Sequence, residues 1–365
     1  MEYQEDNILL NNTGFKEPKR VLFGKKKDYL SGDGNLCGED IKLDGQWVDD
    51  IDDLELEVQN QYFETMHCWI WNTIKAVCLL AWVKYKEKWN KSERYNGVLG
   101  GATPNGGSPH EGCESVRNYG LIPQEELPWT PNLNTFWEFS SPRPMAQKYI
   151  NIGKEWLRKY SFKHDWVVWP TFIGEMKYKM GFSINQIIDE NIDNMKQALK
   201  KSPLGAAVLA WQTRDGMAYR TYTQGDNHWT LIVGYVDGQY WIIYDSYLNC
   251  WRKAEWRYPW RWVKRYELNK TNADELDAEY IKTAYYAKNI KGDNSSAIYF
   301  IYDNKKHPYP SMDEYNRICS QYFADDSYIT VAQSALDLIE EGTPMILENI
   351  KNAEPFNTIT ESLKK

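Results

Sequence analysis

Residues 68–89 read CWIWNTIKAVCLLAWVKYKEKW, and residues 59–69, which run into them, read QNQYFETMHCW. The longer stretch turns abruptly apolar at Cys68, which predicts a buried helix that starts there. The loop before it is rich in amide, carboxylate and imidazole side chains, so a polar loop delivers a cysteine to the first turn of a core helix. Cysteine is often only a small buried hydrophobe. At a helix N-terminus, however, the pKa of a thiol is lowered and the nucleophilic thiolate is favoured.

The composition is that of a globular protein. The chain has 365 residues, of which 42% are hydrophobic, and its formal net charge is −8. A negative charge without an extended basic stripe argues against a nucleic-acid partner. The 17 tryptophans favour a rigid aromatic core over an aromatic binding surface. A chain of this length can hold one large domain or two ordinary ones.

Location and cofactors are predicted from what the sequence lacks. No apolar run approaches the roughly 20 residues that span a bilayer, and MEYQEDNILLNN at the N-terminus has no basic and apolar signal region. We therefore expect no membrane span and a cytoplasmic location by default, with a virion as the alternative. The six cysteines are widely spaced and show no CxxC pattern. We expect reduced thiols, no metal and no cofactor, while one or two disulfides stay open.

The character of the sequence changes along the chain and divides it into regions. Residues 1–45 are polar and lack sustained periodicity, which is typical of an extended arm or a pro-segment-like region. Helical patterns prevail over 46–200, and β-branched and aromatic patterns over 201–268, so a helical half precedes a strand-rich half of one domain. Residues 269–365 follow as a linker and a small C-terminal α/β extension. The predicted fold class is α+β.

The strand-rich half contains a predicted hairpin. HWTLIVGYV (228–236) and QYWIIYDSY (239–247) are strand patterns, and the Asp-Gly pair at 237–238 is a turn signal between them. Because the outer ends of a hairpin meet, His228 and Asp245 are expected to be neighbours. The carboxylate can then accept a hydrogen bond from the imidazole and hold its tautomer.

These residues suit thiol chemistry, which needs a thiolate, a base, a group that orients the base and a donor to the oxyanion. Cys68, His228 and Asp245 supply the first three. Gln61 precedes the cysteine by seven residues, within reach to offer its amide to an oxyanion. The alternative for Cys68 is a buried structural thiol.

The same residues, in the same order, resemble the papain family of cysteine peptidases. VQNQ (58–61) resembles the segment with the oxyanion glutamine, and HCW (67–69) resembles the nucleophile with its tryptophan. NGG (105–107) and YGLI (119–122) resemble the substrate loop and the helix end of that family. HWTLIVGYVDGQYWIIYDS (228–246) resembles the strands of the histidine and of the third catalytic residue. Each match alone is weak, and their common order makes the set specific.

This resemblance implies a fold and a function. It implies a helical subdomain with the central Cys68 helix and an antiparallel β-barrel subdomain with His228 and Asp245. Gln61 and the backbone N–H of Cys68 would form the oxyanion hole, and Gly106 and Gly107 would pair with a peptide or protein substrate as an extra strand. The implied substrate-binding residues are Gly106, Gly107, Trp69, Trp229 and Tyr247. The predicted function is hydrolysis of peptide bonds by a Cys-His-Asp triad, in a divergent family member from a virus, phage or bacterium.

Departures from the family keep alternatives open. The loop from Gln61 to Cys68 is one residue longer than the family's, and Asp245 stands where the family usually has asparagine. Trp229 occupies a position where the family has a small residue that lines the second substrate pocket. One alternative is a catalytically inactive papain-like fold that serves as a structural or binding module of a surface or virion assembly, with a partner on the C-terminal extension. Another is transglutaminase-like or amidase chemistry on the same triad.

The remaining histidines are interpreted as structural. His67 is expected at the surface or behind the site, because it points away from the nucleophile. His110, His164 and His307 are expected to have no carboxylate or thiol neighbour at ligand spacing. Cys113 is expected to be a buried free thiol.

Overall fold

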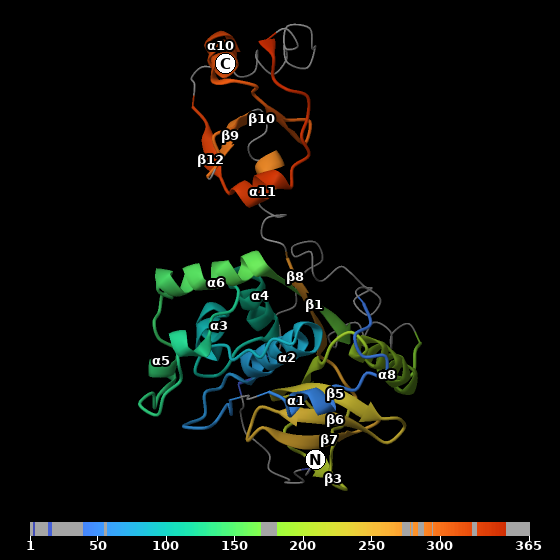
Figure 1. Cartoon of the computed structure of the whole chain (residues 1–365). Coiled ribbons are helices and arrows are strands. Elements are labelled where there is room, and N and C mark those ends of the chain that lie inside the picture. Colours follow the sequence, from blue (N-terminus) through green and yellow to red (C-terminus); the bar gives the residue numbers. More distant parts are fainter. Residues whose placement is uncertain are drawn as a thin grey trace. The chain divides into compact units, whose positions relative to one another are not determined.

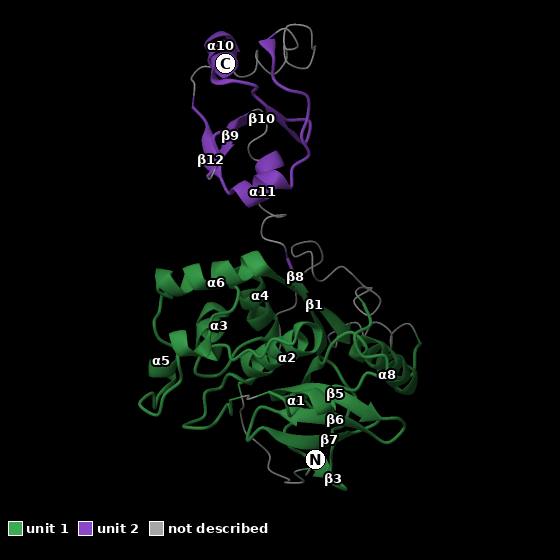
Figure 2. Ribbon diagram, viewed as in Figure 1, with its two compact units in different colours: residues 1–269 green, residues 270–365 purple. Residues whose placement is uncertain are grey.

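The computed structural model describes residues 3, 14–16, 39–54, 57–168, 181–271, 278, 280–283, 288–293, 295–322 and 327–347. The chain divides into two compact units, Met1–Asn269 and Lys270–Lys365, and Figure 2 shows them in different colours. This division lies one residue beyond the predicted boundary at 268. Each unit has hydrophobic clusters of its own.

The helices of the first unit do not all lie on one side (Figure 1). They are α1 (Val48–Ile51), α2 (Cys68–Tyr85), α3 (Glu93–Leu99), α4 (Pro109–Tyr119), α5 (Phe136–Phe139), α6 (Gln147–Lys159) and α8 (Ile184–Leu199), with a short 3-10 helix at Gln124–Glu126. Helices α2 to α6 gather together, whereas α1 and α8 lie beside the strands. α2 begins at Cys68 as predicted and is buried without interruption from there to Ala81. It ends earlier than the predicted 89, because Lys86 adopts a left-handed conformation with φ 59°.

Two helix ends in this unit coincide with typical capping residues. Ser183 caps α8 and exchanges hydrogen bonds with Gln186 in a capping box. Gly120 ends α4 with φ 73°, a conformation that glycine adopts at no steric cost. Both helix ends are therefore marked by residues whose local chemistry favours them.

The strands of the first unit form an eight-stranded sheet. Its strands are β1 (Tyr160–Val168), β2 (Leu204–Val208), β3 (Thr213–Arg214), β4 (Met217–Ala218), β5 (His228–Val236), β6 (Tyr240–Asp245), β7 (Cys250–Glu255) and β8 (Val263–Lys270). They are ordered β1-β8-β2-β5-β6-β7-β4-β3. Among the described residues no pairing joins the outer strands, so no closed barrel is found in this part of the chain. The α+β class is confirmed.

The predicted hairpin and one unpredicted strand define the sheet near the helices. β5 and β6 pair antiparallel about the turn at 237–238, and α2 packs against β5. β1 lies in a region where the sequence predicts helix, and its buried side chains alternate from Tyr160 to Trp166 before the pattern breaks. β1 pairs with β8 and thereby extends the sheet toward the helical side.

The second unit is a small α/β module. Strands β9 (Asn289–Gly292), β10 (Ile298–Tyr302), β11 (Lys305–Pro308) and β12 (Ile329–Val331) form a sheet ordered β11-β10-β9-β12, with α10 (Met312–Tyr322) and α11 (Gln333–Asp337). β10 and β11 are joined by a turn with a left-handed pair at 303–304. The predicted C-terminal extension lies partly outside the described residues, from 348 onward. No described helix is long and apolar enough to cross a membrane.

Candidate active site

Cys68 is the first residue of α2 and is fully buried. The turn before it contains His67 as N-cap and Met66 in the left-handed conformation, with φ 57°. The first backbone N–H groups of a helix lack intrahelical partners and carry a positive partial charge. The helix terminus therefore favours negative charge at the position of Cys68, whereas the burial of the side chain opposes it.

His228 and Asp245 lie together in the core of the unit. The Nε2 atom of His228 is 2.7 Å from Oδ1 of Asp245, and both side chains are fully buried. His228 begins β5 and Asp245 ends β6, so the antiparallel hairpin delivers both to the same edge. A bond at Nε2 directs Nδ1 to the opposite edge of the imidazole ring.

The carboxylate of Asp245 has several further donors. Its Oδ2 atom accepts hydrogen bonds from Nε1 of Trp211 at 3.0 Å and from Nε of Arg252 at 3.2 Å, and its Oδ1 atom accepts from the backbone N–H of Tyr247 at 3.2 Å. Burial alone would raise the pKa of Asp245, but the His228 imidazole and the Arg252 guanidinium outweigh it and hold that pKa below its usual value. Asp245 is therefore an anion that faces the imidazole.

Asn72 connects the nucleophile helix to both strands. Its Nδ2 atom lies 3.2 Å from the carbonyl oxygen of Cys68, 2.6 Å from that of Trp229 and 3.0 Å from Oγ of Ser246. Trp229 follows His228, and Ser246 follows Asp245. One buried amide thus brings the first turn of α2 to the residues next to the histidine and the aspartate.

The two glutamines of the preceding loop are placed differently. Gln61 is exposed, and its Nε2 atom is 3.3 Å from the hydroxyl of Tyr62. Gln59 is fully buried; its Oε1 accepts from Oγ of Ser246 at 2.7 Å, and its backbone N–H donates to the carbonyl of Ser246 at 3.0 Å. The structure therefore brings Gln59, rather than the predicted Gln61, to the strand end that carries Asp245.

The glycine loop of the sequence analysis is occupied by the chain's own N-terminal arm. Phe15 forms a parallel bridge with Gly107: the N–H of Gly107 donates to the carbonyl of Gly14, and the N–H of Lys16 donates to the carbonyl of Gly107, both at 2.9 Å. A Cβ on Gly106 would lie 1.7 Å from the carbonyl oxygen of Gly14, so only glycine permits this approach.

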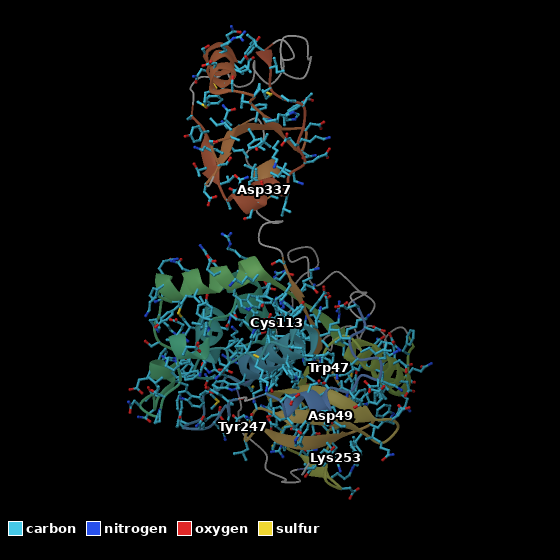
Figure 3. All side chains as sticks on the ribbon, in the orientation of Figure 1. Trp47, Asp49, Cys113, Tyr247, Lys253 and Asp337 are labelled. Atoms are coloured by element: carbon cyan, nitrogen blue, oxygen red, sulfur yellow. The ribbon has the colours of Figure 1, made fainter. Side chains whose placement is uncertain are left out.

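The three predicted aromatic residues surround the same place. Trp69 is buried beneath the glycine loop, since a Cβ on Gly107 would lie 2.4 Å from its indole ring. Trp229 is buried and stacks on Phe15, with ring centroids 5.9 Å apart and planes 6° from parallel. Tyr247, labelled in Figure 3, meets the ring of His228 edge to face at a centroid distance of 5.2 Å.

His67 is buried, so of the two expected positions, at the surface or behind the site, the structure excludes the first. Its Nδ1 atom bonds the carbonyl of Thr65, and its ring packs against Trp69 and Phe139. Burial lowers the pKa of His67 to about 4, and the imidazole is neutral at neutral pH. His67 supports the loop from within.

The five described cysteines are buried and free of disulfides. Burial raises the pKa of Cys78 to about 12 and the pKa values of Cys113 and Cys250 to about 11. These thiols stay protonated at neutral pH and are poor nucleophiles. Cys37 lies outside the described residues.

One group of side chains has the spacing of metal ligands. His110 and Glu114 lie one turn apart on α4, and with His164 of β1 their ligand atoms all fall within 4.8 Å of one another. His110 and His164 therefore do have a carboxylate at ligand spacing, which the sequence analysis overlooked. Lys264 reaches Nδ1 of His164 at 2.7 Å and Arg117 reaches Glu114 at 2.6 Å. These two cations oppose a divalent metal ion, and the group is a hydrogen-bonded network.

Several residues of the site were not predicted. Asn72 is a lone amide in an apolar helix, a signal that the sequence does contain. Trp211 and Arg252 converge on Asp245 from distant segments, and Arg252 stacks on Trp211 at 4.5 Å. The link of these two residues to Asp245 depends on tertiary contacts, which local sequence patterns do not reveal.

Known proteins resemble the chain only distantly. No protein-family model matches the sequence, and no curated protein is similar enough to count as a relative. The proform of Amb a 11, a ragweed pollen cysteine protease, is 11% identical with a TM-score of 0.42, covering 65% of this chain and 70% of that one. The SERA5 proenzyme from Plasmodium falciparum is 15% identical with a TM-score of 0.42 over 71% of each chain. Xylellain, a cysteine protease from Xylella fastidiosa, is 14% identical with a TM-score of 0.40, and the match covers 61% of this chain and 88% of that one.

These neighbours are papain-like cysteine proteases, the family that the sequence resembles. They do not support the expected viral or bacterial source. At these identities and TM-scores the likeness concerns the fold at most, so the activity has to be argued from the site itself.

Proposed function

We propose that the chain is a cysteine peptidase that hydrolyses peptide bonds in peptide or protein substrates. The observation that carries the proposal is the link through Asn72, which holds the first turn of α2 beside the buried His228–Asp245 pair. A helix-terminal cysteine, a buried imidazole and an anion that orients it are the parts that thiol-based acyl transfer requires.

The steps follow from these parts. The Cys68 thiolate attacks the carbonyl carbon and forms a C–S bond, and the His228 imidazolium gives its proton to the leaving amine as the C–N bond breaks. Water then attacks the thioester while His228 accepts a proton, which releases the acid and restores the thiolate–imidazolium pair. Asp245 orients the imidazole and stabilises its positive charge.

The oxyanion needs two donors in this scheme. The backbone N–H of Cys68 is one, and Gln61 is the other. The amide of Gln61 lies 3.3 Å from the Tyr62 hydroxyl here, so it would exchange that contact for the oxyanion. The extra residue in the loop from Gln61 to Cys68 determines whether the amide of Gln61 can make this exchange.

The arm at residues 14–16 acts in this proposal as an inhibitory segment. It takes the backbone of Gly107 that a substrate would pair with, and the ring of Phe15 covers Trp229. Burying one phenylalanine side chain stabilises such docking by about 2 kcal/mol. Release of the arm would open the site.

The same observation favours the second candidate, an inactive module of the same fold that serves in an assembly. If the arm never leaves, the cleft stays filled and Cys68 is a structural thiol. The transglutaminase-like or amidase alternative has no such support in the structure.

Self-cleavage and peptide turnover distinguish these candidates. We expect the wild-type chain to turn over a mixed peptide library and Cys68→Ala to be inactive, with Cys319→Ala, a buried cysteine of the second unit, as matched control. An iodoacetamide-type or epoxide probe should modify Cys68 in a manner that depends on His228. If neither the wild type nor a variant with a displaced arm is labelled or active, the inactive module is the correct description.

A further inference from the structure

Glu64 lies in the loop that precedes the nucleophile and contacts both halves of the candidate site. Its Oε1 atom accepts a hydrogen bond from the backbone N–H of Met66 at 2.7 Å and another from Nε2 of Gln59 at 3.4 Å. Its Oε2 atom bonds the hydroxyl of Tyr247. The carboxyl group thus connects the loop to the segment that follows Asp245.

On the side of the nucleophile, Glu64 holds a residue in an unusual conformation. Met66 has φ 57°, a left-handed conformation that is unfavourable for a residue with a side chain. Its N–H is held by Glu64, and its carbonyl oxygen is 3.2 Å from Nε1 of Trp69. Met66 stands two positions before Cys68, so these contacts set the direction from which the chain enters α2.

On the side of the base, Glu64 acts through Tyr247. The ring of Tyr247 meets the imidazole of His228 at a centroid distance of 5.2 Å and an interplanar angle of 71°, and its backbone N–H is 3.2 Å from Oδ1 of Asp245. A side chain that fixes the Tyr247 hydroxyl therefore fixes the ring that covers the imidazole.

We infer that Glu64 is a positioning residue that sets the relative placement of Cys68 and His228 by holding Met66 and Tyr247 together. The inference rests on the proposed function, because it concerns the reaction of that cysteine and that histidine. Glu64 does not contact the reacting atoms in this scheme.

The chemistry of the carboxyl group adds a dependence on pH. Burial, with a smaller contribution from the Asp245 carboxylate, raises the pKa of Glu64 to about 7 against the lowering effect of the hydrogen bonds from Met66 and Gln59. The groups that face it are Asp245 and Tyr247 from the end of β6, with His228 behind the tyrosine ring. Glutamine reproduces the protonated acid: its Oε1 can accept from Met66, and its amide can donate to the Tyr247 oxygen.

The test compares Glu64→Ala, Glu64→Gln and Tyr247→Phe in the full chain, with Glu57→Gln as a matched control. Glu57 is a second largely buried carboxyl group of the same segment, whose side chain bonds Gln124. The first measurement is the ultraviolet absorbance of the thiolate against pH, with Cys68→Ala subtracted, which needs no access to the cleft. The second is kcat and KM for peptide turnover against pH.

We expect Glu64→Ala to raise the midpoint of thiolate formation by about one pH unit and to lower kcat about tenfold or more with little change in KM. Tyr247→Phe should also raise the midpoint of thiolate formation, but by a smaller amount than Glu64→Ala. If Glu64→Ala fails to fold, Tyr247→Phe still tests the inference. Glu64→Gln should restore the placement and remove an inflection near the pKa of about 7 from the pH profile of kcat. Glu57→Gln should behave as the wild type.

Two results would overturn the inference, and they are distinguishable. If the wild type forms the thiolate at low pH and Glu64→Ala leaves midpoint and kcat unchanged, Glu64 has no positioning role while the proposed function stands. If the wild type forms no thiolate below the usual pKa of a thiol, the proposed function fails and the inference fails with it.

Discussion

The described residues of the first unit contain two buried histidine–carboxylate pairs, and only one of them suits catalysis. His228 and Asp245 are 2.7 Å apart, and His164 and Glu114 are 2.9 Å apart. A helix with a cysteine lies beside each pair: Cys68 begins α2, whereas Cys113 lies within α4. Figure 3 labels Cys113 and Tyr247 well apart, so the two groups are separate places in the unit.

The surroundings of each pair explain the difference. Nδ1 of His164 contacts the ammonium group of Lys264 at 2.7 Å, and burial together with this cation lowers the pKa of His164 to about 3. An imidazole held neutral in this way cannot accept the proton of a thiol at neutral pH. A histidine–carboxylate bond is therefore not sufficient for a site. A thiol–imidazole site also needs a cysteine at a helix terminus and an imidazole that has no cation as a direct neighbour.

The largest expected effect separates the two histidines by activity. His228→Gln should lower kcat/KM for peptide turnover by about 10²–10⁴-fold, because the general acid and base is lost. His164→Gln should leave kcat/KM within a small factor of the wild type, because its imidazole does not reach the reacting groups. Steady-state kinetics of both variants measure this. A similar loss in both would mean that the second pair supports the site.

The second prediction concerns how the His164–Glu114 pair affects the stability of the folded chain. The pKa of His164 is about 3 in the folded chain and about 6.5 when unfolded, so the unfolded state binds a proton that the folded state excludes. Stability is therefore lost as the pH falls from about 6.5 toward 3, by about 2–3 kcal/mol between pH 7 and 4.5. In His164→Gln this part of the pH dependence should vanish.

Denaturant unfolding at the two pH values measures this difference. The buried His67, with its pKa of about 4, adds a loss of the same sign, so His164→Gln should flatten the curve without abolishing its slope. An unchanged pH dependence in the variant would show that His164 is charged in the folded chain.

The third prediction concerns the arm at residues 14–16, which covers the candidate site at Cys68 and does not cover Cys113. Gly14 has φ 91°, and a Cβ there would lie 2.1 Å from the carbonyl oxygen of Met66. Gly14→Ala should therefore displace residues 14–16 and increase both the alkylation rate of Cys68 and the turnover of peptide by about tenfold or more. Cys113 should stay unlabelled in the variant, because the arm does not protect it.

Mass spectrometry of the alkylated chain locates the label, and Gly101→Ala is a suitable control. Gly101 also has a positive φ, of 75°, but a Cβ there meets nothing within 4 Å. Equal rates in the wild type and in Gly14→Ala would mean that the arm does not inhibit.

Local patterns predicted the parts of this site that local physics determines. The start of α2 at Cys68 follows from the abrupt change to apolar residues, and the His228–Asp245 contact follows from a two-residue hairpin turn. The choice between Gln59 and Gln61 does not, because both stand in the same polar loop and Ser246, far along the chain, selects the buried one. β1 had an alternating pattern, but helical segments on both sides masked it.

The smallest expected effect concerns the half-buried carboxyl group of Glu64, and the sign of its pH dependence is opposite to that of His164. The pKa of Glu64 is about 7 in the folded chain against about 4.5 in the unfolded chain, so the folded state holds the proton more tightly. Its contribution to stability is complete below about pH 4.5 and is lost as the pH rises through 7. Because the side chain is partly exposed and hydrogen-bonded, the loss should be about 1 kcal/mol, less than the shift alone implies. Glu64→Gln should therefore be more stable than the wild type at pH 8 and equal to it at pH 4.5 in denaturant unfolding. Greater stability of the wild type at pH 8 would mean that the carboxylate is the favoured form, held by the Tyr247 hydroxyl as donor.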